Sequence, residues 1–93
     1  MIKSFICKET EKIFYRHFSR RLPTNLIRIA QRKLAVLDAA ERLDDLRVPP
    51  GNHLEKLTRD RKDQYSIRIN DQWRICFRWS EGSAYDVEIV DYH

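Results

Sequence analysis

Apolar and polar residues alternate along three segments in the C-terminal half of the chain, residues 64–70, 73–79 and 84–92. Alternation over this length is typical of strands that bury one side. The segments are separated by Asn70-Asp71 and by Glu81-Gly82-Ser83, whose residue types favour turns. The pattern therefore predicts three consecutive antiparallel strands joined by short turns.

The N-terminal half has a helical pattern, in which apolar residues recur at three- and four-residue spacing. Residues 2–6 alternate weakly and predict a short strand. Residues 8–18 predict a short helix with an apolar side formed by Ile13, Phe14 and Phe18. A longer helix is predicted to begin at Pro23-Thr24, because threonine can cap the first free amides. Its core-packing face consists of Ile27, Ala30, Leu34 and Leu37.

The run Val48-Pro49-Pro50-Gly51-Asn52 is the clearest break in the chain. It predicts an irregular loop between the two halves, and residues 53–57 are compatible with one turn of helix. The sequence thus predicts a single α+β domain over residues 1–93, of order βααβββ. We expect a mainly antiparallel, twisted sheet with two N-terminal helices packed on its apolar face.

The apolar faces also predict strand register, because a slip of one residue would turn every side chain over. The first hairpin should pair Tyr65 with Phe77 and Ile67 with Ile75. The same register places Arg68 opposite Arg74 on the other face of the sheet.

The second hairpin is predicted to pair Trp79 with Tyr85. This register would bring Arg78 to Asp86 and Cys76 to Glu88. It would also leave Val90 beside Arg74, with Tyr92 one diagonal away. Alternation then puts Tyr92 on the arginine face but Asp91 and His93 on the opposite face.

Arg68 facing Arg74 breaks a local rule, because like charges across a strand pair cost up to about 1 kcal/mol. Such a break marks a candidate anion site. Alternatively, the two arginines spread into water near Glu88 at little cost. The preceding loop adds basic residues that could follow a phosphate backbone or form an ordinary solvated face; they include Lys56, Arg59 and Arg61.

The overall charge favours a polyanionic partner. The formal net charge is +4, and twelve of the eighteen basic residues are arginine, which binds phosphate in a forked geometry. No apolar run approaches the roughly 20 residues needed to span a bilayer. Without a signal-peptide pattern at residues 1–5, we expect a cytoplasmic protein without membrane contact.

The sequence shows no motif for a bound cofactor. Cys7 and Cys76 lack the spacing of a zinc site or a disulfide framework. His17, His53 and His93 likewise have no metal-ligand spacing. A glycine-rich phosphate loop and a nucleophile triad are also missing from the sequence, so we expect no cofactor.

The tripeptide Asp91-Tyr92-His93 is the best candidate for chemistry. Histidine transfers protons well near neutral pH, and the carboxylate of Asp91 would favour its protonated form. Cleavage of RNA through the 2′-hydroxyl needs a base, an acid and positive charge on the phosphorane. His93, Tyr92 and Arg74 could meet these needs without a metal.

Four segments resemble the HigB toxins, or plasmid maintenance system killer proteins, of the RelE/ParE superfamily. They are Met1-Ile2-Lys3-Ser4-Phe5, Gln64-Tyr65-Ser66-Ile67-Arg68-Ile69-Asn70, Trp73-Arg74-Ile75-Cys76-Phe77 and Asp91-Tyr92-His93. The resemblance covers essentially the whole chain. It implies a ribosome-dependent messenger RNA endonuclease with a RelE-like fold. It also implies a HigA-type helix-turn-helix antitoxin that, in complex with the toxin, represses their own operon at operator DNA.

The same resemblance implies roles for individual residues. Asp91, Tyr92 and His93 would form the active site, with His93 as general acid or base and Arg74 on the scissile phosphate. We expect Arg68, Arg78 and the basic loop to bind RNA. One departure is Leu57-Thr58-Arg59-Asp60-Arg61, where many relatives have Leu-Lys-Gly-Asp-Arg. Either Lys56 or Arg59 supplies the missing charge, or activity is weaker or its codon preference altered.

Two other functions fit the same sequence. A toxin of the ParE type would poison DNA gyrase without RNA chemistry, although the acid–base residues at the end of the sequence argue against it. A non-enzymatic module would only help a partner to repress transcription, and its expression alone would be harmless.

Overall fold

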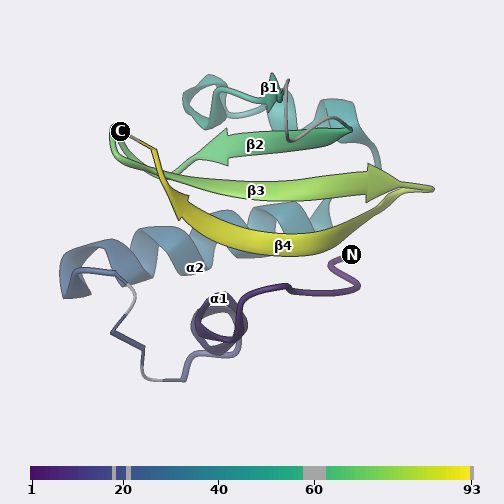
Figure 1. Ribbon diagram of the computed structural model, residues 1–93. Coiled ribbons are helices and arrows are strands. Elements are labelled where there is room, and N and C mark those ends of the chain that lie inside the picture. Colours follow the sequence, from purple (N-terminus) through teal and green to yellow (C-terminus); the bar gives the residue numbers. More distant parts are fainter. Residues whose placement is uncertain (18, 21, 58–62, 93) are drawn as a thin grey trace.

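The computed structural model describes residues 1–17, 19–20, 22–57 and 63–92. Its helices are α1 (Lys8–Phe14) and α2 (Thr24–Ala39), with the 3-10 helices η1 (Leu43–Arg47) and η2 (Pro50–Asn52). Its strands are β1 (Glu55–Lys56), β2 (Gln64–Arg68), β3 (Trp73–Ser80) and β4 (Ser83–Asp91). They form one antiparallel sheet in the order β1-β2-β3-β4 (Figure 1).

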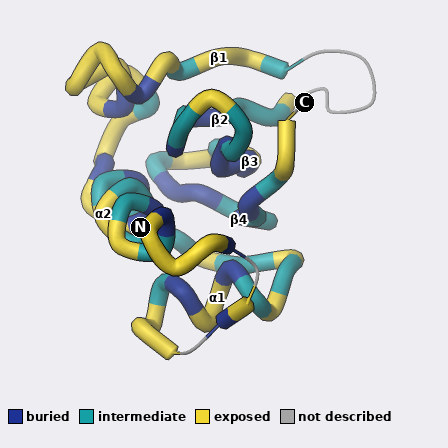
Figure 2. Tube along the Cα trace, turned by 90° about the vertical axis from the view of Figure 1, so that its left-hand side faces the viewer, coloured by how far each residue is buried: buried dark blue, intermediate teal, exposed yellow. Residues whose placement is uncertain are grey.

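The predicted α+β architecture is confirmed in its main features. On the apolar face of α2, Ala30, Leu34 and Leu37 are buried as predicted, together with Leu26, whereas the predicted Ile27 is only partly buried. They share one core with sheet residues that include Ile67, Ile75 and Phe77. Figure 2 shows α2 on one side of the sheet and the last residues of β4 on the other. In the described part of the chain, no helix is long and apolar enough to cross a membrane.

The expected N-terminal strand at residues 2–6 is wrong. This segment runs beside β4 and makes only two isolated parallel bridges, Ile2 with Ala84 and Phe5 with Val87. Between them Asp86 has a left-handed backbone, with φ of 54°. Its amide binds the Ser4 hydroxyl at 2.9 Å instead of a backbone carbonyl. The interrupted edge of β4 therefore does not support a continuous ladder.

The first helix is shorter than predicted, ending at Phe14. The His17 amide binds the Lys12 carbonyl at 2.7 Å, and the Arg16 amide binds that of Ile13 at 3.1 Å. These bonds form a Schellman-type end in which Arg16 has a left-handed φ of 63°. Glycine is preferred at this position, and other residues pay about 1 kcal/mol there. Phe18, expected on the apolar side, lies outside the described residues.

The possible helical turn at residues 53–57 is also wrong. One turn of 3-10 helix comes earlier, at η2, and Glu55 and Lys56 form β1 against Ser66 and Tyr65 of β2. A strand of two residues is too short to show alternation, so the sequence pattern could not predict it. This edge strand places the chain after η2 directly beside the middle of β2.

The predicted register of the first hairpin is confirmed. Tyr65 pairs with Phe77, Ile67 with Ile75, and Arg68 with Arg74.

The second hairpin differs near its turn. Cys76 pairs with Glu88 and Arg74 with Val90 as expected, but Trp79 pairs with Ala84 and Arg78 with Tyr85. The bulge around Asp86 inserts one residue into β4, which shifts the pairing beyond it. The Arg78–Asp86 ion pair still forms, at 3.2 Å.

Asn52 connects η2 to its surroundings from a fully buried position. Its side-chain amide donates to the carbonyls of Leu46, at 3.1 Å, and Val48, at 3.3 Å. Its side-chain oxygen accepts a hydrogen bond from Lys33 of α2. A single buried amide thus holds η1, η2 and α2 together and determines where His53 and β1 begin.

Replacing Asn52 with alanine should destabilise the fold by about 1–3 kcal/mol, because the carbonyl of buried Leu46 loses its donor, as does that of Val48. Urea unfolding measures this loss. The matched control is Asn25→Ala on the exposed surface of α2, expected to change stability by less than about 0.5 kcal/mol. Equal stability of the Asn52→Ala protein and the wild type would contradict this role.

Candidate functional site

Arg74 is the most constrained cation on the sheet, with only 9% of its surface exposed. Its Nε donates to the Ser66 hydroxyl at 2.8 Å. Its Nη2 donates to the carbonyls of Ser66, at 3.3 Å, and His53. The same nitrogen lies 3.0 Å from Oε1 of Glu55. One side of the guanidinium is therefore fully engaged with β2, η2 and β1.

The other terminal nitrogen of Arg74, Nη1, has no hydrogen-bond partner among the described residues. Arginine has five N–H donors in a rigid plane. Because Nε and Nη2 are anchored, the direction of Nη1 is also determined. Arg74 can therefore offer a preoriented pair of donors to an anion without reorganising.

Arg68 faces Arg74 as the sequence predicts, but each arginine has its own carboxylate. Arg68 forms an ion pair with Asp71 in the β2–β3 turn, whereas Arg74 pairs with Glu55. Both carboxylates come from outside the two predicted strands, so register alone did not reveal this compensation. The repulsion expected across the strand pair is thereby reduced.

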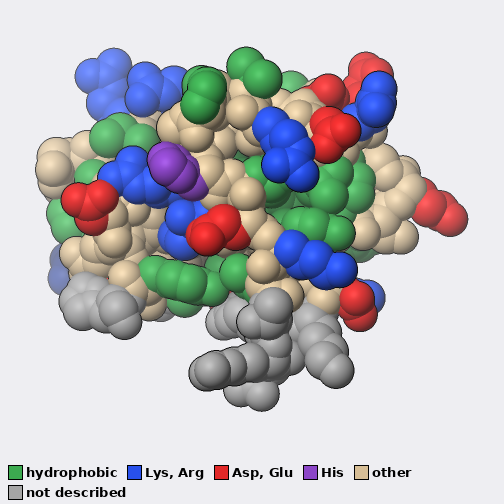
Figure 3. Space-filling view, turned by 90° about the horizontal axis from the view of Figure 1, so that it is seen from above, with side chains coloured by type: hydrophobic (Ala, Val, Ile, Leu, Met, Phe, Trp, Pro, Cys, Tyr) green, Lys and Arg blue, Asp and Glu red, His purple; other side chains and the backbone are tan. Residues whose placement is uncertain are grey.

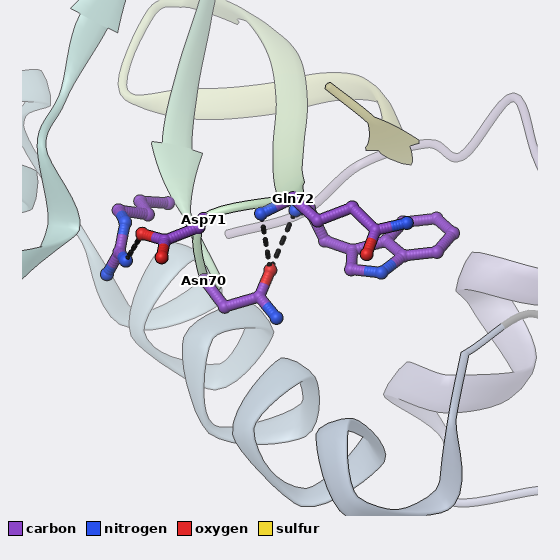
Figure 4. A network of polar contacts seen from close by, with 5 residues as sticks. Asn70, Asp71 and Gln72 are labelled. Carbon is purple, nitrogen blue, oxygen red and sulfur yellow. Dashed lines mark hydrogen bonds and ion pairs between the residues drawn. The ribbon is translucent and has the colours of Figure 1, made fainter. Parts of the chain in front are cut away.

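The β2–β3 turn that carries Asp71 is stabilised by Asn70 (Figure 4). The Asn70 side-chain oxygen accepts hydrogen bonds from the amides of Gln72, at 2.9 Å, and Trp73, at 2.8 Å. This arrangement is an asparagine turn closed on its own backbone. It determines the ends of β2 and β3, and hence the positions of Arg68 and Arg74.

His53 is a residue that sequence reasoning missed as a part of this site. It follows η2 with a left-handed backbone, φ of 43°, and it is exposed. Its carbonyl accepts from Arg74, so its backbone is fixed beside the guanidinium. His53 was missed because strand β1 was not predicted. The pairing of Glu55 with Ser66 in β1 brings the residues before Glu55 close to Arg74.

The view from above shows histidine, basic and acidic side chains gathered on the surface that carries β1 (Figure 3). Lys33 of α2 reaches the flank of this surface by donating to Asn52. The pKa of Lys33 is lowered mainly by burial. The nearby positive charges of Arg32 and Arg68 lower it further. Lys33 therefore lies near the positive charges of Arg32 and Arg68.

The end of β4 does not gather around Arg74 as a group. Asp91 pairs with Trp73, one residue before Arg74, so its side chain lies on the opposite face. Its Oδ2 accepts a hydrogen bond from the Gln72 side chain at 3.1 Å. Tyr92 follows the strand and is 38% exposed, with its amide bound to the Gln72 carbonyl. His93 lies outside the described residues.

The remaining predicted RNA-binding residues are spread along the sheet. Lys56 is exposed on β1, and Arg59 and Arg61 lie outside the described residues. Arg78 is four residues beyond Arg74 on β3, roughly 13 Å away at about 3.3 Å per residue. A cavity of about 450 Å³ adjoins Arg78, lined by Asp63, Tyr65, Arg78, Trp79, Ser80 and Tyr85.

The described residues contain no group of three or more His, Cys, Asp or Glu side chains placed to hold a metal ion. The site in that part of the chain is instead built from arginine, serine, a histidine backbone and one glutamate. The serine, the histidine carbonyl and the glutamate accept from Arg74, and the remaining N–H donors of the guanidinium suit the binding of an oxyanion.

Comparisons with known proteins identify the family of the chain. A family model described as the RelE-like toxin of type II toxin-antitoxin system HigB matches residues 3–93. The chain is 45% identical to Toxin HigB-1 of Vibrio cholerae over 65 residues, which are 70% of this chain and 68% of that protein. It is 30% identical to Endoribonuclease HigB of Proteus vulgaris over 93 residues, the full length of both chains.

Among solved structures, the fold is similar to that of a chain in the YoeB-YefM complex from Staphylococcus aureus. The TM-score is 0.58 at 17% identity, covering 100% of this chain and 98% of that one. This similarity shows the fold alone. The family match and the full-length relative show the family to which the chain belongs. The chain therefore belongs to the HigB-like, RelE-type toxins of type II toxin–antitoxin systems.

Proposed function

We propose that this protein is an endoribonuclease that cuts messenger RNA on the ribosome by metal-independent acid–base catalysis. The observation that carries the proposal is the guanidinium of Arg74. It is held from one side by Ser66, His53 and Glu55, while Nη1 is without a partner among the described residues. The full-length similarity to a protein named Endoribonuclease HigB supports the same activity.

The proposed reaction is attack by the ribose 2′-oxygen on the adjacent phosphorus. A base removes the 2′-hydroxyl proton as the new P–O bond forms. The P–O5′ bond then breaks, and an acid gives its proton to the leaving 5′-oxygen. The products are a 2′,3′-cyclic phosphate and a 5′-hydroxyl. Negative charge grows on the phosphorane oxygens, where the Arg74 guanidinium would stabilise it.

His93 is the proposed acid or base, with Tyr92 and Asp91 contributing beside it. The structure adds His53 as a second candidate, because its backbone is fixed by Arg74 and its side chain is exposed. Two imidazoles would allow one to take the 2′-proton and the other to protonate the 5′-oxygen. Asp91, bound by Gln72 on the opposite face, fits a role in positioning better than proton transfer.

The basic residues of the sheet would hold the substrate. Lys56, Arg68 and Arg78, with Arg59 and Arg61 of the loop, would bind phosphates of the messenger and of the ribosome. The aromatic side chains around Arg78 could stack on bases. Because Arg68 and Arg78 already pair with Asp71 and Asp86, RNA phosphates would have to compete with these carboxylates.

Membership of a type II toxin family implies a cognate antitoxin. We propose that this partner is a HigA-like helix-turn-helix protein, and that operator DNA is bound only through the complex. A cytoplasmic location follows from ribosomes as the site of action. No cofactor is part of the proposed reaction.

The Ser66→Ala variant tests whether Arg74 needs its anchor. The variant should lose about 1–3 kcal/mol of stability, because Nε of a buried charged group loses its acceptor. Urea unfolding measures this. Under conditions where the variant is folded, kcat for RNA cleavage should fall more than KM rises, since the guanidinium is misdirected. Thr24→Ala at the exposed start of α2 is the control, and unchanged cleavage by Ser66→Ala would contradict the anchoring role.

Histidine variants test the proposed chemistry. His93→Ala and His53→Ala should each reduce messenger cleavage about 100- to 10,000-fold, the usual contribution of a general acid or base. Cleavage is mapped on a translated transcript by primer extension. His17→Ala, an exposed histidine beyond α1, is the control and should cleave normally.

Undiminished cleavage by His93→Ala would remove that residue from the mechanism. Inhibition of gyrase supercoiling by the wild type, with transcripts left intact, would instead favour a toxin of the ParE type.

A further inference from the structure

A second cationic hollow lies on the helical side of the molecule. Its volume is about 410 Å³, and it is lined by Arg16, Arg28, Gln31, Arg32 and Ala35. Arg28 and Arg32 are exposed on α2, and Arg16 follows the end of α1. α2 buries its opposite face against the sheet. The hollow therefore lies on the outer side of α2, whereas Arg74 lies on β3.

The three arginines of this hollow lack acidic partners in the described part of the chain. This distinguishes them from the arginines discussed above. Arg68, Arg74 and Arg78 each form an ion pair with a carboxylate. Three uncompensated guanidinium groups around one hollow repel one another and attract an external anion.

Arg16 adds an independent observation. It occupies the left-handed position of the helix end, where glycine is strongly preferred. An arginine at this position carries a conformational cost but places its side chain in the lining of the hollow. A local preference that is broken without local compensation is expected at functional sites.

The spacing of the other two arginines suits an extended polyanion. Arg28 and Arg32 are one turn apart on the same face of α2, about 6 Å along the axis. Guanidinium groups bind phosphate oxygens through paired hydrogen bonds. The lining has only one apolar side chain, Ala35, whereas the centre of a protein–protein interface is usually apolar. The chemistry therefore favours a nucleic acid backbone over an acidic protein segment.

We propose that Arg16, Arg28 and Arg32 form a second RNA-backbone site, separate from the Arg74 surface. The choice of RNA as ligand rests on the proposed function. The sheet face would hold the RNA strand that is cut, and the helical face would hold a different stretch of RNA. Engagement of both faces would raise overall affinity through effective concentration without new contacts to the cut strand.

Binding of a fully 2′-O-methylated RNA oligonucleotide tests this site without cleavage. Affinity is measured by fluorescence anisotropy over a series of salt concentrations. The Arg28→Gln/Arg32→Gln variant should bind more weakly, and its salt slope should fall by roughly 1.4, about 0.7 for each lost phosphate contact. The control is Arg47→Gln, an exposed arginine already paired with Asp44, which should retain the wild-type slope.

Arg16→Gly separates binding from folding. Glycine suits the left-handed backbone, so this variant should melt at a higher temperature than the wild type. Its salt slope should nevertheless fall by roughly 0.7. An RNA affinity and slope equal to those of Arg47→Gln, in both hollow variants, would overturn the proposal. So would binding of poly-glutamate, but not of RNA, that depends on Arg28 and Arg32.

This RNA-binding titration, combined with an RNA cleavage assay of Arg74→Lys, distinguishes this proposal from the proposed function. If Arg74→Lys impairs RNA cleavage while the hollow variants bind RNA normally, the endonuclease proposal stands and the second site is wrong. If the hollow variants lose RNA affinity while Arg74→Lys cleaves normally, the second site stands and the catalytic proposal is wrong.

Discussion

The anchoring of the Arg74 guanidinium is the interaction on which the rest of the site depends. A cation this deeply placed is tolerated only when its N–H groups find acceptors. Ser66 and His53 supply uncharged acceptors, and Glu55 supplies the countercharge. These three residues come from β2, the end of η2 and β1, so one side chain connects segments up to 21 residues apart in sequence. Because Nε and Nη2 are held in place, the N–H groups of Nη1 point in a fixed direction and can bind an anion.

Two asparagines support this anchor, one before β1 and one in the turn after β2. On one side, Asn52 fixes η2 from a fully buried position and so sets the path of His53 and Glu55. On the other side, Asn70 closes the turn that aligns Arg68 and Arg74. Neither asparagine contacts Arg74, yet both determine the geometry in which it presents its charge. The helices contribute by covering the apolar face, which leaves the other face for binding.

The existence of β2, β3, β4 and the two α-helices follows from the hydrophobic periodicity of the sequence. The register of the first hairpin also follows, because alternation has only one consistent solution there. The pairing of Arg68 with Arg74 is a direct result of that pattern. The bulge at Asp86, by contrast, depends on the contact with Ser4, 82 residues away. The residues around Asp86 show no sequence pattern that predicts this bulge. β1 is two residues long and could not be seen by periodicity, so Glu55 and His53 were missed as neighbours of Arg74. Asp91 was expected on the face opposite Arg74, and its pairing with Trp73 places it there.

In the proposed reaction, RNA is cut by its own 2′-oxygen at the Arg74 surface. The most direct measurement uses a translated transcript with a single 2′-deoxynucleotide immediately 5′ of the mapped cut, compared with the all-ribose transcript. Cleavage at that position should disappear in the deoxy transcript, and the all-ribose products should carry a 2′,3′-cyclic phosphate and a 5′-hydroxyl. Cleavage of the deoxy transcript at the same position, or a 5′-phosphate on the product, would contradict the proposed chemistry.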